Sequence, residues 1–189
     1  MSKAVLISIR PKWCEKIANG EKTIEVRKTR PKLETPLKCY IYCTNGETVR
    51  TPPRAYCKNI DGSIVYKQEI MNGKVIGEFV CDRVSTITYD GGWLACTTNA
   101  AFSPASCLSR SEIMDYIGPR GRAYGWHISN LKIYDTPREL GAFYRACDTK
   151  RSVCEACKLF CERKDLCYGD GTMQITRPPQ SWGYVEELP

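Results

Sequence analysis

The chain has a single histidine among its 189 residues, so catalytic or metal sites that need several histidines are excluded. It also lacks the phosphate-binding Walker loop, the G-x-S-x-G elbow of serine hydrolases and the H-E-x-x-H zinc motif. We therefore expect no nucleotide cofactor. No apolar run approaches the roughly 18 residues that span a bilayer, and the opening apolar run is too short for a secretory signal. These absences favour a cytoplasmic protein with no membrane contact.

Positive charge is present, and it is concentrated at the start of the chain. Residues 1–38 hold ten Lys or Arg against four Asp or Glu, whereas the remainder holds eighteen against seventeen, which together give the net charge of +7. A basic surface of this kind suits an anionic partner, most commonly nucleic acid. Many small basic proteins bind no polyanion, so the charge alone leaves both interpretations open.

Short β-branched and apolar runs alternate with turn signals along most of the chain. We expect strands at 4–10, 22–28, 37–44, 73–90, 123–135 and around a Pro-Pro bend in 172–188, with an exposed excursion at 45–62. Helices are expected at 11–20, 109–118 and 136–144. Many short strands with few short helices indicate an α+β protein built on a small mixed β-barrel or a highly curved sheet.

The segment "KTIEVRK" at 22–28 contains an apolar pair and several charged side chains. Strand alternation places Ile24 and Val26 on one face, and Glu25 and Arg27 on the other. Two interpretations follow. The charged residues form either a solvated strand face of little energetic weight or, together with Lys22, the polar floor of a pocket.

The stretch "ISIRPKWCEKIANGEKTIEVRK" at 7–28 resembles the opening of the ASCH family, the activating-signal-cointegrator homology domains. It carries the motif G-x-K-x-x-E-x-R as Gly20, Lys22, Glu25 and Arg27. The segments "GKVIGEFVC" (73–81) and "AYGWHIS" (123–129) also look like strands of that family. The resemblance implies a PUA-like β-barrel domain over residues 1–135, with a cleft beside the first helix that holds RNA or a nucleoside. Residues 136–189 would add a helix, a cysteine-rich insert and a closing strand.

The resemblance also raises an enzymatic alternative. Some small members of the family hydrolyse the acetyl amide of N4-acetylcytidine, and there a threonine stands where this chain has Glu25. If the chain is an enzyme, Lys22 and Glu25 are the candidate catalytic residues, with lysine as base or oxyanion donor and glutamate as water activator.

If the chain is a binder, its contacts would be phosphate, carbonyl and amine groups of RNA or a modified nucleoside. The candidate binding residues are Arg10, Lys12, Lys22, Glu25, Arg27 and His127. Trp13 is a candidate for stacking a base, although its place on the helix face with Ile17 favours core packing. Glu78 is a further candidate acid. A third hypothesis is a protein-interaction adaptor that uses the basic N-terminal face.

Twelve cysteines are many for a reducing compartment, and five of them crowd into residues 147–167. Within that cluster, the spacing of Cys154, Cys157, Cys161 and Cys167 allows four thiolates to reach one structural zinc ion. A disulfide-linked loop and a set of unlinked cysteines are the alternatives, and an iron–sulfur cluster is a further one. A site with four sulfur ligands has no open position for water, so we expect a structural role.

Overall fold

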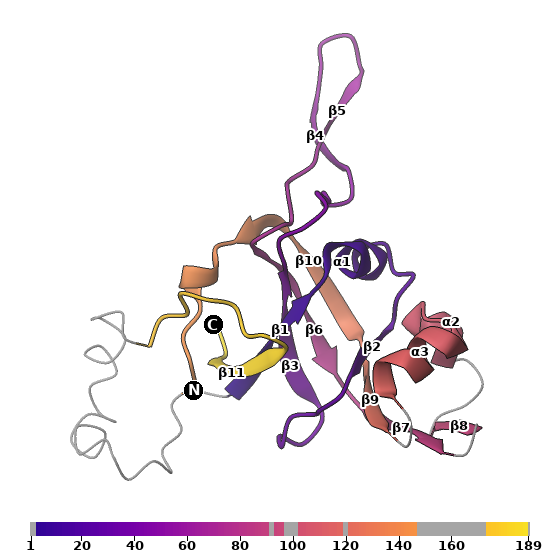
Figure 1. The fold of residues 1–189 in the computed structure, drawn as a ribbon. Helices are drawn as coiled ribbons and strands as arrows, with labels where there is room; N and C mark the ends of the chain where they lie inside the picture. The colour runs from indigo at the N-terminus through magenta and orange to yellow at the C-terminus, as the bar shows by residue number, and fades with distance from the viewer. Residues whose placement is uncertain (1–2, 91–92, 97–101, 119–120, 147–172, 189) are drawn as a thin grey trace, which may run out of the picture.

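The computed structural model describes residues 3–90, 93–96, 102–118, 121–146 and 173–188 (Figure 1). Strands dominate these residues, and the helices are short, so the expected α+β class is confirmed. The strands are β1 (Lys3–Ile9), β2 (Ile24–Arg27), β3 (Leu37–Cys43), β4 (Arg54–Lys58), β5 (Ile64–Lys67), β6 (Val75–Cys81), β7 (Val84–Asp90), β8 (Trp93–Cys96), β9 (Arg122–His127), β10 (Ser129–Arg138) and β11 (Trp182–Glu186). The helices are α1 (Pro11–Ala18), α2 (Phe102–Ser106), α3 (Arg110–Ile117) and the 3-10 turn η1 (Leu140–Ala142).

Two sheets form the body of the protein. The larger has the order β10-β6-β3-β1-β11, and the smaller has the order β2-β9-β7-β8. The β1–β3 pair is parallel, and the other pairs in these two sheets are antiparallel. No hydrogen-bonded ladder joins the two sheets within the described residues, so the closed barrel that we expected is not seen there.

The main hydrophobic core lies between the two sheets. It includes Ile7 from β1, Ile41 from β3, Phe79 from β6 and Trp126 from β9, all almost fully buried. Helix α1 begins at Pro11, whose fixed φ suits the first helical turn, and it adds Cys14 and Ile17 to this core. The core thus holds α1 in place, and the Lys22 N–H bond to the Lys16 carbonyl at 3.1 Å ties the turn before β2 to this helix.

Helices α2 and α3 lie together beside the smaller sheet (Figure 1). The predicted helix start at Ser109 is confirmed, because its side chain and that of Glu112 form a reciprocal capping box. Phe102 of α2 reaches β9 at Gly125, where a Cβ atom would lie only 2.5 Å from the phenylalanine ring. Glycine at this position therefore allows α2 to pack close to the sheet.

The helix expected at 136–144 is wrong. Strand β10 continues to Arg138, and a single 3-10 turn follows at Leu140–Ala142. Strand β10 contains Pro137, and it is an edge strand, where a residue without a backbone N–H is tolerated. The strand thus passes the predicted domain boundary at 135, and β11 joins the larger sheet beside β1.

Most of the excursion expected at 45–62 is exposed, although Val49 and Thr51 are buried, and part of it belongs to a hairpin. Strands β4 and β5 pair with each other, and the hairpin projects away from both sheets (Figure 1). The predicted run at 73–90 is the two strands β6 and β7, which are separated by Asp82 and Arg83. A bulge lies next to Gly77, where the register with β3 shifts.

Candidate functional site

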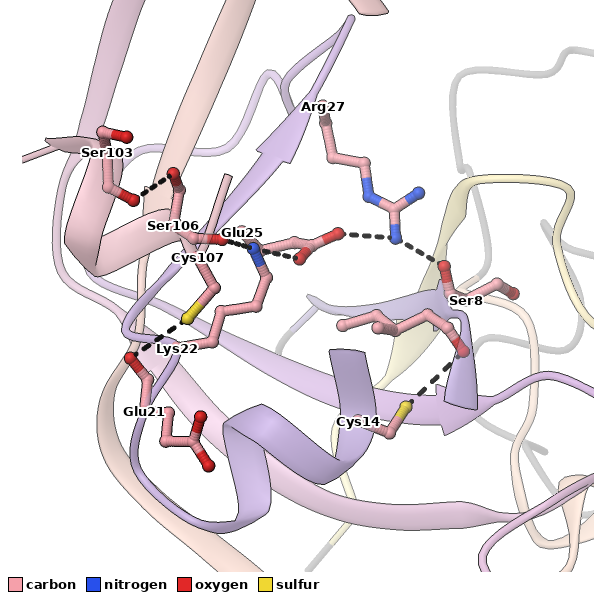
Figure 2. Close-up of polar contacts among 10 residues, drawn as sticks. Ser8, Cys14, Glu21, Lys22, Glu25, Arg27, Ser103, Ser106 and Cys107 are labelled. Carbon is pink, nitrogen blue, oxygen red and sulfur yellow. Dashed lines mark hydrogen bonds and ion pairs between the residues drawn. The ribbon is translucent and has the colours of Figure 1, made fainter. Parts of the chain in front are cut away.

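The charged motif residues form a continuous chain of contacts (Figure 2). Gly20, at a φ of +77°, ends the α1 turn and directs the backbone towards Lys22. The Lys22 ammonium donates to the Ser106 carbonyl at 2.6 Å and lies 3.4 Å from Glu25 Oε2. Glu25 Oε1 lies 3.0 Å from Arg27 Nη2. The Arg27 guanidinium in turn donates to the carbonyl of Ser8 on β1.

These side chains are buried, so the solvated-face interpretation of the motif is wrong. The exposed fractions are 2% for the Lys22 side chain, 7% for Glu25 and 13% for Arg27. Burial lowers the pKa of Lys22, and the Glu25 charge opposes that shift without reversing it. With all three groups ionised, the triad Lys22–Glu25–Arg27 carries a net charge of +1 in a water-poor site.

Side chains and backbone from two other elements cover the lysine end of the triad. The Lys22 ammonium lies 5.1 Å from the centroid of the Trp13 ring on α1. On the other side, Cys107 follows α2 with a φ of +55°, and its thiol donates to the Glu21 carbonyl at 3.4 Å. The end of α2 is thus tied to the turn that holds Lys22, which explains the low exposure of that side chain.

The arginine end of the triad adjoins aromatic side chains of β9. In the antiparallel register, Trp126 lies opposite Glu25 and Tyr124 lies opposite Arg27, so all four side chains share one face of the smaller sheet. The Trp126 indole Nε1 and the Arg27 Nε are both buried, and neither has a hydrogen-bond partner among the described residues. This face therefore presents two buried N–H donors without an acceptor.

Strand β11 adds two aromatic residues to the same region. The Trp182 ring lies 5.8 Å from the Trp126 ring, and its Nε1 donates to Thr29 Oγ1 at 3.0 Å. Tyr184 Oη accepts from the backbone N–H of Lys32 at 2.8 Å. The sequence left open whether Trp182, beside a proline-rich bend, folds back over the cleft, and it gave no role to Tyr184. Their i, i+2 spacing, which puts both side chains on one strand face, was the signal for Tyr184.

The other predicted binding residues lie at varying distances from the triad. Lys12 is exposed and lies 4.3 Å above the Trp13 ring, and Arg10 is exposed at the N-cap of α1. His127 has the opposite parity to Trp126, so it lies on the other sheet face from Glu25, and its Nδ1 contacts Asp82. Only Lys22, Glu25 and Arg27 of the predicted set are in direct contact with one another.

Glu78 is not brought to the triad. It accepts a hydrogen bond from Tyr134 at 2.6 Å and lies 3.4 Å from Lys38, on the side of the larger sheet where Tyr40 and Tyr134 pack. Burial raises the pKa of Glu78, but the Tyr134 hydrogen bond and the Lys38 charge outweigh that effect, so the pKa lies below its ordinary value. This carboxylate therefore stabilises the outer sheet face.

The predicted zinc ligands Cys154, Cys157, Cys161 and Cys167 lie outside the described residues. Within the part of the chain that the structure describes, no group of three or more His, Cys, Asp or Glu side chains is arranged to hold a metal ion. None of the described helices is long and apolar enough to cross a membrane. The zinc site stays a prediction.

No family model and no curated protein matches the chain in sequence. Among solved structures, ASCH from Zymomonas mobilis is similar at 16% identity and a TM-score of 0.54, covering 97% of this chain and 88% of that one. Two point mutants of that protein match at 15% identity, with TM-scores of 0.54 and 0.55. They cover 98% and 97% of this chain, and 92% and 89% of their own. The chain therefore has the ASCH fold, as the motif around Lys22 predicted.

Proposed function

We propose that this protein binds RNA or a modified nucleoside at the sheet face that carries Glu25, Arg27 and Trp126. The observation that carries the proposal is the pair of buried N–H donors, Arg27 Nε and Trp126 Nε1, which lack an acceptor among the described residues. A buried donor left unpaired costs about 1–3 kcal/mol. Because Trp126 is fully buried, a ligand reaches these donors only when the side chains packed on them, such as Trp182, move aside, and its oxygen acceptors would then recover that free energy.

The charge of the site supports an anionic or carbonyl-rich ligand. The triad holds two cations against one carboxylate, and it is shielded from water, so its net positive charge is weakly screened. Phosphate oxygens and the carbonyl oxygens of nucleobases are acceptors that suit such a site. Glu25 would accept from an exocyclic amine if its contact with Arg27 opened.

Aromatic rings supply the second element of nucleic-acid recognition. Tyr124, Trp182 and Tyr184 are all partly exposed beside the buried donors. Stacking of a base on such a ring contributes about 1–3 kcal/mol by alanine substitution. The combination of aromatic rings with Arg27 is the arrangement by which proteins hold unpaired bases.

The proposal is tested by fluorescence anisotropy of a labelled ten-nucleotide single-stranded RNA, titrated with the protein at several salt concentrations. Arg27→Lys keeps the charge but removes Nε, and Trp126→Phe keeps an aromatic ring but removes the indole N–H. Each should weaken binding about 2- to 12-fold, the equivalent of one hydrogen bond of 0.5–1.5 kcal/mol. Lys132→Ala, an exposed charge on β10, is the matched control and should leave affinity nearly unchanged.

Absence of RNA binding by the wild-type protein at low salt would refute the proposal. So would equal affinity of the wild type and both donor variants, provided that thermal unfolding shows the variants to be folded. A shallow salt dependence would indicate that phosphate is not the ligand, since neutralised phosphates give a slope of about 0.7 each in log–log form for single strands.

The lowered pKa of Lys22 favours a second candidate function, hydrolysis of an acylated nucleoside. A lysine whose pKa is depressed is a better general base near neutral pH than an ordinary surface lysine. Incubation with N4-acetylcytidine should then release cytidine from the wild type and none from Lys22→Met. Binding without turnover would leave Lys22 a recognition residue and the protein a binding module.

A further inference from the structure

A hollow lies beside the loop that joins β2 to β3. It is lined by loop residues 30–35 together with Leu37 and Val84, and its volume of about 740 Å³ falls within the range of ligand pockets, roughly 300–1,000 Å³. Lys22, Glu25 and Arg27 do not line it. The hollow is therefore a site separate from the triad.

The loop around the hollow is held in place from two sides. The backbone N–H of Lys32 donates to Tyr184, and Thr29 accepts from Trp182. The Arg30 guanidinium lies 5.6 Å from the Tyr124 ring centroid, a cation–π distance. These contacts fix the polar loop before any ligand arrives, which lowers the entropic cost of binding.

The lining combines basic side chains with apolar ones. Arg30 and Lys32 are exposed, and neither forms an ion pair with another described residue. Glu34 is the one carboxylate among the described lining residues, which together carry a net charge of +1. Leu33 and Val84 supply apolar surface beneath the charges. This composition suits a ligand that carries both phosphate and a flat ring.

One lining residue of the hollow, Val84, belongs to the sheet face that carries the unpaired donors. Val84 lies opposite Trp126 in the β7–β9 register, so both side chains share that face. Leu33 and Val84 pack against the core cluster to which Trp126 belongs. Arg30 of the same loop lies against Tyr124, a partly exposed ring of that face, so the hollow and the aromatic rings are neighbours.

We infer that this hollow is a second subsite, in which Arg30 and Lys32 bind backbone phosphates of a single-stranded RNA while a neighbouring base rests on Leu33 and Val84. The inference rests on the proposed function and deepens it. It makes the ligand an oligonucleotide, one nucleotide of which lies beside the partly exposed rings of Tyr124, Trp182 and Tyr184, rather than a free nucleoside.

The test compares the wild type with the double variant Arg30→Ala/Lys32→Ala, using the labelled ten-nucleotide RNA and, separately, cytidine as an unlabelled competitor. Loss of two phosphate contacts should reduce the salt slope by about 1.4 and weaken RNA binding about 25-fold at 0.1 M salt, with affinities converging near 1 M. The affinity for cytidine should not change. Lys3→Ala/Lys132→Ala, which also removes two exposed charges, is the control.

Two outcomes would overturn the inference while leaving the proposed function intact. One is an unchanged RNA affinity and salt slope in the double variant, with Arg27→Lys still weakening binding. The other is an equal loss in the control variant, which would indicate a diffuse charge effect. If the wild type binds no RNA at all, both the proposed function and the second subsite are refuted.

Discussion

Replacing Glu25 by glutamine should destabilise the protein more than replacing Lys22 by methionine. Glu25 is the only anion of the triad, and its two oxygens face Lys22 at 3.4 Å and Arg27 at 3.0 Å. Glutamine keeps the shape of the side chain but leaves two buried cations without a counter-charge. Methionine at position 22 instead leaves Glu25 paired with Arg27.

The expected magnitudes differ clearly. Removing the shared partner of a buried ion pair costs about 3–5 kcal/mol, because an uncompensated charge remains in a medium of low polarity. Lys22→Met loses the hydrogen bond to the Ser106 carbonyl, worth about 1.5–3 kcal/mol for a charged donor, but it also removes the desolvation penalty of the ammonium. We expect a net cost below about 2 kcal/mol for this variant.

Urea unfolding followed by tryptophan fluorescence at pH 7 measures both free energies of unfolding, with equal m-values as the condition for comparing them. The double variant is the internal control. In it Arg27 is the one remaining charged residue of the triad, and its loss of stability should be smaller than the sum of the two single losses. A cost for Glu25→Gln below about 1 kcal/mol, or one no larger than that of Lys22→Met, would show that the triad is solvated and would refute the reasoning.

Three further outcomes follow from contacts outside the triad. Gly125→Ala should lower the free energy of unfolding by about 1–3 kcal/mol in the same urea assay, because the new Cβ would lie 2.5 Å from Phe102. An unchanged free energy of unfolding in this variant would contradict the prediction. The Glu78 pKa is lowered in the folded state from its ordinary value of 4.5. Its contribution is therefore present above pH 4.5 and is lost as the pH falls through the folded value. Glu78→Gln, which retains an acceptor for Tyr134, should flatten that part of the stability–pH curve. Ser109→Ala should cost about 1 kcal/mol through loss of the capping box, measured as a lower Tm.

The membership of the triad was predictable, but its burial was not. Strand alternation places Glu25 and Arg27 on one face, and the motif spacing adds Lys22. What removes them from water comes from distant parts of the chain: the Ser106 carbonyl at one end and the Ser8 carbonyl at the other. No local pattern around residues 20–28 contains that information.

His127 shows a second limit of prediction from the sequence. Its polar parity on β9 was predicted correctly, because it alternates with Trp126. Parity cannot say which of the two faces meets the site, and the Asp82 contact puts His127 on the far face. The segment 136–144, predicted as a helix, was wrong for a different reason. Its Pro137 fits both a first helical turn and an edge strand, and only the sheet order decides between them.

The hydrogen bond from Trp182 to Thr29 joins residues 153 positions apart. At about 5–20 residues per second, the ribosome would make residue 182 roughly 8–30 seconds after residue 29. During that interval the loop after β2 lacks both of its hydrogen bonds to β11, and β1 lacks the strand that pairs with its outer edge. Pairing of such widely separated segments is also slow, because a large loop must close before the contact forms. The loop after β2 should thus acquire its fixed shape only after β11 is made, later than the synthesis of the buried core strands β1, β3, β6 and β9.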